Sequence, residues 1–134
     1  FLKSKGITYK TLSYGGYNDK DVETLSNKCK FCFMVNGTES QGIAVQEIMS
    51  TDTPMFVWDI KEWNDQGDEW RVPATSIPYW SDECGEVFYN VEDMEKTYDR
   101  FYAKIDTYQP RKYVEENLSL KKSVNTLLEI LNAA

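Results

Sequence analysis

The segment between residues 31 and 58 constrains the fold of this chain more than any other part of the sequence. Residues 31–35 and 55–58 are two short apolar runs rich in β-prone side chains, and each predicts a buried strand. Between them lies a polar loop, followed by a pattern over residues 41–50 that predicts a helix. This order forms a β-loop-α-β unit, the repeating unit of parallel sheets with crossover helices.

The remaining chain continues the alternation of strands and helices. Its apolar spacing and capping residues predict a strand over residues 9–14, a helix over 18–28 capped by Asn18 or Asp19, a long aromatic-rich loop over 59–82, a strand over 86–89, and helices over 91–108 and 120–132 that Pro110 separates. We therefore expect an α/β fold, with a Rossmann-like parallel sheet and crossover helices in one domain over residues 1–134.

Charge and composition argue against several classes of partner. The chain has 134 residues, is 41% hydrophobic and carries a net charge of −7, from 15 basic and 22 acidic residues. This excess of acid disfavours binding to nucleic acid or to an anionic membrane. No apolar stretch approaches the roughly 20 residues needed to cross a bilayer, and no signal peptide can be recognised. We expect no transmembrane segment.

The cysteines raise the question of a metal site. Cys29 and Cys32 have the spacing of half a zinc site or of a redox pair, but the chain has no histidine and Cys84 is its one further thiol. A structural zinc site would lack a fourth ligand of the usual kind. We expect no metal, with the cysteines packed as small apolar side chains, and the odd number favours a reducing, cytoplasmic compartment.

The loop after the first strand of the unit has the composition of an anion site. Asn36 and Gly37 break the strand, and Thr38 and Ser40 can each cap the following helix. The first amides of that helix have no partners within it, and the helix dipole adds positive potential there. A phosphate is therefore expected near the backbone amides of Gln41, Gly42 and Ile43.

Two carboxylates flank this predicted anion site. Glu39 lies in the loop, and Glu47 follows about two turns into the helix. Carboxylates accept hydrogen bonds from hydroxyl groups such as those of a ribose or a hexose. A phosphate flanked by sugar hydroxyls corresponds to a nucleotide sugar.

The pattern from Glu39 to Glu47, followed by Thr53 and Pro54 and then a strand, resembles a known motif. It is similar to the glutamate-x7-glutamate motif of retaining glycosyltransferases with the GT-B fold, in the large group called glycosyl transferases group 1 (family 4-like). In that family the motif lies in the C-terminal, donor-binding Rossmann-like domain. Residues 12–17, 21–28 and 84–88 also look like family elements, so that the resemblance covers most of residues 7–131.

The resemblance implies a role for each matching residue. Glu39 would lie by the donor hexose as the catalytic residue, and Glu47 would hold the ribose hydroxyls. The remaining substrate-binding residues would contact the donor sugar and diphosphate or lie near the base: Gln41, Gly42 and Ile43 at the diphosphate, and Gly16 and Tyr17 at the base. The donor would be UDP- or GDP-linked, and this fold generally needs no metal or other cofactor.

The chain also departs from the family. Nothing in residues 1–14 matches the arginine and lysine that neutralise the diphosphate, and the N-terminal acceptor-binding domain is absent. Since the chain also lacks an initiator methionine, we expect a C-terminal fragment of a longer protein, partly representing the C-terminal half of a GT-B fold. The full-length protein would transfer a hexose to a sugar, lipid or protein acceptor and could contact a membrane peripherally. The fragment should bind donor weakly and be inactive alone.

Two further functions stay open. The first is a UDP-sugar 2-epimerase-like enzyme, which shares the GT-B architecture, although the serine-glycine-glycine run expected there is missing. The second is a noncatalytic GT-B-like interaction domain, which the missing basic pair would favour.

Overall fold

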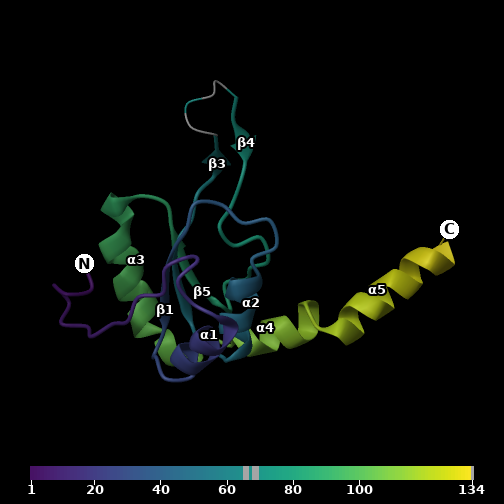
Figure 1. The fold of residues 1–134 in the computed structure, drawn as a ribbon, viewed down its shortest axis with the longest axis horizontal. Helices are drawn as coiled ribbons and strands as arrows, with labels where there is room; N and C mark the ends of the chain where they lie inside the picture. Colours follow the sequence, from purple (N-terminus) through teal and green to yellow (C-terminus); the bar gives the residue numbers. More distant parts are fainter. Residues whose placement is uncertain (65–66, 68–69, 134) are drawn as a thin grey trace.

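The computed structural model describes residues 1–64, 67 and 70–133 of the protein (Figure 1). Its main sheet contains three parallel strands, in the order β1 (Cys32–Val35), β2 (Met55–Trp58) and β5 (Gly85–Phe88). Each strand begins and ends within one residue of its predicted position. The predicted α/β class with a parallel sheet is therefore confirmed, and the arrangement is compatible with a Rossmann-like fold.

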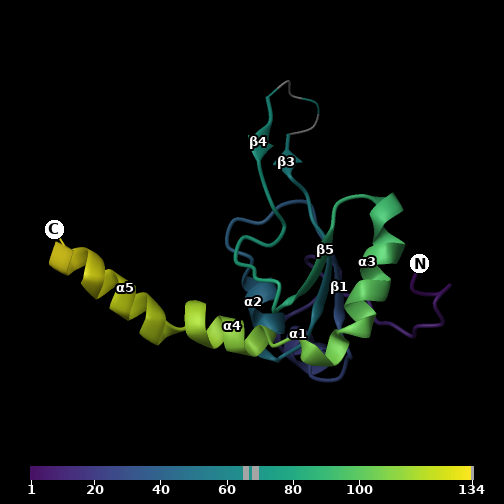
Figure 2. The same cartoon turned by 180° about the vertical axis from the view of Figure 1, so that it is seen from behind.

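Helices cover both faces of this sheet (Figures 1 and 2). α3 (Val91–Ala103) packs against one face, whereas α2 (Ile43–Ser50) and α4 (Pro110–Asn117) cover the other. α1 (Asp19–Ser26) lies beside α2. The crossover from β1 through α2 to β2 matches the β-loop-α-β unit expected from the sequence.

Alternate side chains of β2 divide the core into two layers, because successive residues of a strand point to opposite faces. One layer lies under α2 and α4 and contains the buried residues Val45, Met49, Met55, Val57, Ile77 and Cys84. The other lies under α3 and is largely aromatic, with Phe56, Phe88, Tyr98, Phe101 and Ile105. In that layer Phe56 and Phe88 stack with their ring centroids 4.7 Å apart.

Side-chain caps explain where two of the helices begin. The Asn18 side chain accepts a 3.1 Å hydrogen bond from the Asp21 amide, and the Asp21 carboxylate accepts a 3.0 Å bond from the Asn18 amide. This capping box confirms the predicted start of α1 at Asn18. Asn90 caps α3 in a similar way, through a 2.8 Å bond from the Asp93 amide.

The strand predicted over residues 9–14 is wrong. These residues form no regular element, and Tyr9, Leu12 and Tyr14 are exposed, Tyr14 by 99%. Their β-prone composition is insufficient because the segment neither pairs with the outer edge of β1 nor buries one face.

The single helix predicted over residues 91–108 is shorter than expected. α3 ends at Ala103, and a 3₁₀ turn, η1 (Ile105–Thr107), follows. Pro110 then begins α4, which was not predicted. A proline at the first helical position loses no hydrogen bond, because that amide has no partner within the helix in any case. The residue that separates two helices therefore also starts one.

The long loop predicted over residues 59–82 contains a short hairpin, formed by β3 (Glu62–Trp63) and β4 (Val72–Pro73). The hairpin projects away from the body of the molecule (Figure 1). On either side of the hairpin in the sequence, two tryptophans pack against the core. Trp58 packs against the layer under α3, and Trp80 packs against the layer under α2 and α4. The Trp63 and Trp70 rings meet edge to face on the hairpin itself.

α5 (Leu120–Ala133) extends from the end of α4 into solvent (Figure 2). It corresponds to the helix predicted over residues 120–132, but none of its residues is buried. The apolar residues expected to face a core are all exposed: Leu120, Val124, Leu127, Leu128 and Leu131.

Removing residues 120–134 should therefore leave the stability of the domain nearly unchanged. We expect the free energy of unfolding in urea to change by less than about 1 kcal/mol, since every described side chain that is lost is exposed. As a comparison, removing residues 110–134 also deletes Tyr113, Val114 and Leu118, which pack against the core. That deletion should cost at least about 3 kcal/mol. Equal losses for the two truncations would contradict this description of α5.

Candidate functional site

Two loops meet at the carboxyl edge of the sheet, where ligands of parallel α/β folds commonly bind. The first, here called the glutamate loop (residues 36–42), follows β1 and contains Glu39. The second, the Thr75 loop (residues 74–78), lies between β4 and β5. The Glu39 amide donates a 3.0 Å hydrogen bond to the Thr75 carbonyl and so joins the two loops.

Within the glutamate loop, the half-buried Glu39 is oriented by Asn36. The Asn36 side-chain amide donates a 2.5 Å hydrogen bond to Oε1 of Glu39. The Asn36 side-chain oxygen in turn accepts a 2.8 Å bond from the Gly37 amide. Because Oε1 is engaged in this way, the carboxylate is held to the loop, and among the described residues no donor occupies Oε2.

The Thr75 loop is held by Asp59, the residue directly after β2. Asp59 is 6% exposed, and its carboxylate accepts hydrogen bonds from the Thr75 hydroxyl at 2.9 and 3.0 Å. It also accepts bonds from the Ser76 amide at 2.6 Å and the Ser76 hydroxyl at 2.9 Å. These hydrogen bonds compensate for the burial of the Asp59 carboxylate. They also attach the Thr75 loop to the end of the central strand.

The N-terminus of α2 lies directly beside this pair of loops. Gly42 is the N-cap residue, with a left-handed φ of 62°, and a β-carbon there would come within 3.2 Å of the Pro78 ring. Glycine therefore allows the Thr75 loop to approach the helix end closely.

The first amides of α2 have no hydrogen-bond partner, as predicted, although Gly42 itself is buried against Pro78. Neither Thr38 nor Ser40 caps the helix, because the N-cap is Gly42 and it makes no side-chain cap bond. In the described part of the chain, no group accepts a hydrogen bond from the amides of Gln41, Gly42 or Ile43. These unpaired donors form a positive end that suits an anion.

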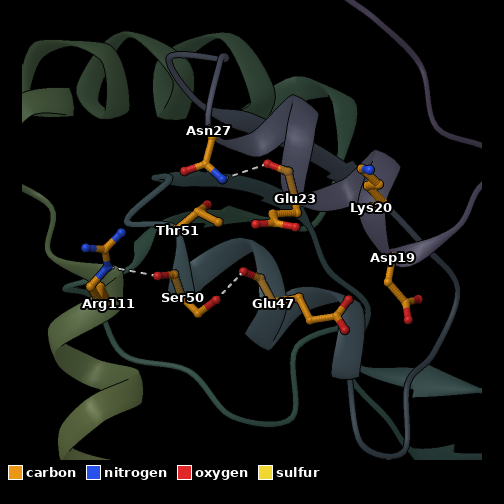
Figure 3. A pocket seen from close by; sticks show the side chains of 8 residues that line it. All are labelled: Asp19, Lys20, Glu23, Asn27, Glu47, Ser50, Thr51 and Arg111. Carbon is orange, nitrogen blue, oxygen red and sulfur yellow. Dashed lines mark hydrogen bonds between the residues drawn. The ribbon is translucent and has the colours of Figure 1, made fainter.

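Glu47 lies in the second turn of α2 and lines a cavity of about 670 Å³ between α1 and α2, here called the α1–α2 groove (Figure 3). The groove is polar, and its lining is Asp19, Lys20, Glu23, Asn27, Glu47, Ser50, Thr51 and Arg111. The Glu47 side chain extends toward α1, on the side of Asp19 and Glu23 (Figure 3). Arg111 lies at the opposite end, where its Nε donates a 2.8 Å bond to the Ser50 carbonyl.

The structure thus brings together part of the predicted site. Glu39, Gln41, Gly42 and Ile43 lie together where the glutamate loop enters α2. Glu47 lies farther along the same helix and faces α1, so that an extended ligand is needed to contact both glutamates.

The remaining predicted residues, Gly16 and Tyr17, lie in the turn that precedes α1. The Gly16 amide donates a 2.9 Å bond to the Ser13 carbonyl, and Gly15 has a φ of 76°. Neither Gly16 nor Tyr17 lines the α1–α2 groove, although the turn leads within two residues to Asp19, which does. Their predicted role at the base stays a prediction.

The sequence prediction did not include Asp59, Thr75 or Ser76 in the site. A usable signal was present, because an aspartate directly after a buried strand is costly unless hydroxyl or amide donors satisfy it. Thr75 and Ser76 supply such donors, but they are sixteen and seventeen residues away, with a hairpin between them.

The three cysteines are free thiols in different environments. Cys84 is buried and burial raises its pKa to about 11, whereas burial raises the pKa of Cys32 to about 12. Cys29 is exposed just after α1. Among the described residues there is no group of three His, Cys, Asp or Glu side chains that could hold a metal ion. The same residues include no helix with the length and apolar character needed to span a membrane.

Comparison with known proteins adds no identification to this geometry. No protein-family model, curated protein or solved structure matches the chain.

Proposed function

We propose that this chain is the donor-binding domain of a retaining glycosyltransferase with the GT-B fold. In a longer protein it would bind a UDP- or GDP-linked hexose, and an N-terminal acceptor domain would complete the active site. The hexose would pass to a sugar, lipid or protein acceptor. The chain alone would bind donor and catalyse no transfer.

The observation that carries this proposal is the junction between the glutamate loop and the Thr75 loop. The bond from the Glu39 amide to the Thr75 carbonyl places Glu39 beside the unpaired amides of α2, at the carboxyl edge of a parallel sheet. A diphosphate at the helix end would have the hexose hydroxyls within reach of Glu39. The ribose would extend along α2 toward Glu47 in the α1–α2 groove.

The chemistry of transfer is consistent with these roles. Cleavage of a nucleotide sugar leaves negative charge on the departing diphosphate, and preorganised amide donors stabilise such charge. The amides of Gln41, Gly42 and Ile43 would serve that purpose, while the Glu39 carboxylate would hold the hexose against them. Carboxylate hydrogen bonds to hydroxyl groups are about twice as strong as neutral ones, which favours a defined sugar orientation.

A noncatalytic interaction domain is the second candidate, and one observation favours it. The glutamate loop and the Thr75 loop contain no lysine or arginine to neutralise a diphosphate. A domain that had lost donor binding would retain the sheet and helices because they form the core. It would not need the open helix end.

Isothermal titration calorimetry with UDP-glucose, GDP-glucose and ADP-glucose separates the two candidates. We expect one of the three to bind with a dissociation constant of about 1 mM, equivalent to roughly 4 kcal/mol, because helix amides act here without basic side chains. Glucose alone should give no saturable heat. If no nucleotide sugar bound at about 10 mM, the donor-binding function would be rejected and the interaction domain favoured.

A further inference from the structure

We propose that Asp59 is a positioning residue of the candidate donor site, acting on Glu39 through the Thr75 loop. This inference rests on the proposed function for its consequence in donor binding. Independently of that function, the buried Asp59 carboxylate determines the position of the Thr75 loop. Asp59 itself is placed in contact with protein groups and not with the donor.

Asp59 is fixed at both its backbone and its side chain. Its amide donates a 2.9 Å hydrogen bond to the Phe88 carbonyl at the end of β5, which anchors the residue to the sheet. Its carboxylate accepts bonds from the Thr75 hydroxyl, the Ser76 hydroxyl and the Ser76 amide. An ionised carboxylate only accepts hydrogen bonds, so that it matches three donors that converge on it.

These contacts hold the Thr75 loop from two sides. The Thr75 hydroxyl donates to Asp59 and also accepts a 3.0 Å bond from the Ile77 amide. Ser76 is fully buried, and Ile77 belongs to the core layer under α2. The loop is therefore tied to Asp59 on one side and to the apolar core on the other.

The position of Glu39 depends on this loop through one backbone contact. The Thr75 carbonyl receives the Glu39 amide at 3.0 Å, from the same residue whose hydroxyl binds Asp59. Movement of Thr75 would release the Glu39 amide and with it the glutamate loop. A buried carboxylate in this place thus links the end of the central strand to the proposed catalytic glutamate.

Hydrogen exchange of the Glu39 amide, followed by NMR, tests this link without any ligand. In Asp59→Leu, which has a similar size but no acceptor, exchange at Glu39 should be at least about tenfold faster than in the unchanged protein. Asp59→Asn keeps an acceptor oxygen and should restore slow exchange to within about threefold. Met49→Ala, a substitution of a buried residue in α2, controls for a general loss of stability. In this variant the ratio between the exchange rate of the Glu39 amide and the exchange rates of the core amides should stay unchanged.

The outcomes test the positioning role of Asp59 separately from the donor-binding function. If exchange at Glu39 in Asp59→Leu rose no more than in Met49→Ala, the positioning role would be overturned. If Asp59→Leu did not fold, Thr75→Val would decide in the same way, because it removes the hydroxyl that binds Asp59 but keeps the backbone. Donor affinity should fall about tenfold in Asp59→Leu and recover in Asp59→Asn. A failure of the unchanged protein to bind any nucleotide sugar would overturn the proposed function, whereas the exchange result would still decide the position of Glu39.

Discussion

Replacing Gly85 with alanine should remove a large part of the stability of the domain. Gly85 begins β5 with a φ of 149°, and a β-carbon there would lie 1.8 Å from the Met55 carbonyl oxygen. Met55 belongs to the central strand and is fully buried, so that neither backbone can move without breaking the pairing of β2 with β5. We expect a loss of at least about 4 kcal/mol in urea unfolding, out of a total of about 5–15 kcal/mol for a domain of ordinary stability.

Gly37→Ala is the matched control for this substitution. A β-carbon at Gly37 would meet no atom within 4 Å, and the residue is exposed. Its effect on the free energy of unfolding should stay within about 1 kcal/mol. A Gly85→Ala protein as stable as Gly37→Ala would show that the close contact between β2 and β5 is not as described.

Loss of either glutamate charge should weaken binding of the nucleotide sugar, and this is the second large effect expected. Glu39→Gln replaces the charged acceptor next to the hexose with a neutral amide oxygen, and Glu47→Gln does the same in the α1–α2 groove. Hydrogen bonds to a charged group contribute about 1.5–3 kcal/mol and those to a neutral group about 0.5–1.5 kcal/mol, so that each variant should lose about 5- to 10-fold in affinity. Calorimetric titration with the preferred nucleotide sugar measures both.

The two variants should also differ from each other in a way that assigns their roles. Glu47→Gln should weaken binding of the free nucleoside diphosphate and of the nucleotide sugar equally, because it would contact ribose. Glu39→Gln should affect the nucleotide sugar alone. Glu92→Gln, an exposed residue in the first turn of α3 on the opposite face of the sheet, serves as the control and should change neither. Unchanged affinity in both site variants would contradict the assignment of the glutamate loop.

The parallel sheet could be predicted where a strand is buried on both faces and therefore reads as a continuous apolar run. Residues 55–58 are the clearest case, since Met55, Phe56 and Val57 are all fully buried. Helix starts were predictable where a side chain makes the cap, as at Asn18. Elements that are marked by a continuous apolar run or by an adjacent capping residue could therefore be predicted from the sequence.

Elements that depend on distant contacts could not be predicted in the same way. Residues 9–14 have the composition of a strand, but no partner pairs with them in the described structure. α4 begins at a proline that was interpreted only as a break, and its packing on α2 involves residues about sixty positions away. α5 has the spacing of a core helix, yet every residue of it described is exposed. Periodicity identifies an apolar face but not what covers it.

The candidate site shows the same division. Glu39, Glu47 and the glycine at the start of α2 belong to one continuous segment, and their spacing could be interpreted directly. The Asp59 network could not, because Asp59 and its donors are separated by the hairpin and come together only when β2 and the Thr75 loop are both in place.

An NMR titration of isotope-labelled protein with UDP, GDP and ADP and with their glucose conjugates tests most directly whether the glutamate loop and α2 form a donor site. We expect saturable shifts of the Gln41, Gly42, Ile43 and Glu47 amides, strongest with one base. A further shift at Glu39 should appear only with the sugar conjugate. Amides of α3 on the opposite face should not move. Saturable shifts confined to other surfaces, or none with any of these ligands at millimolar concentration, would contradict a donor site at the carboxyl edge of the sheet.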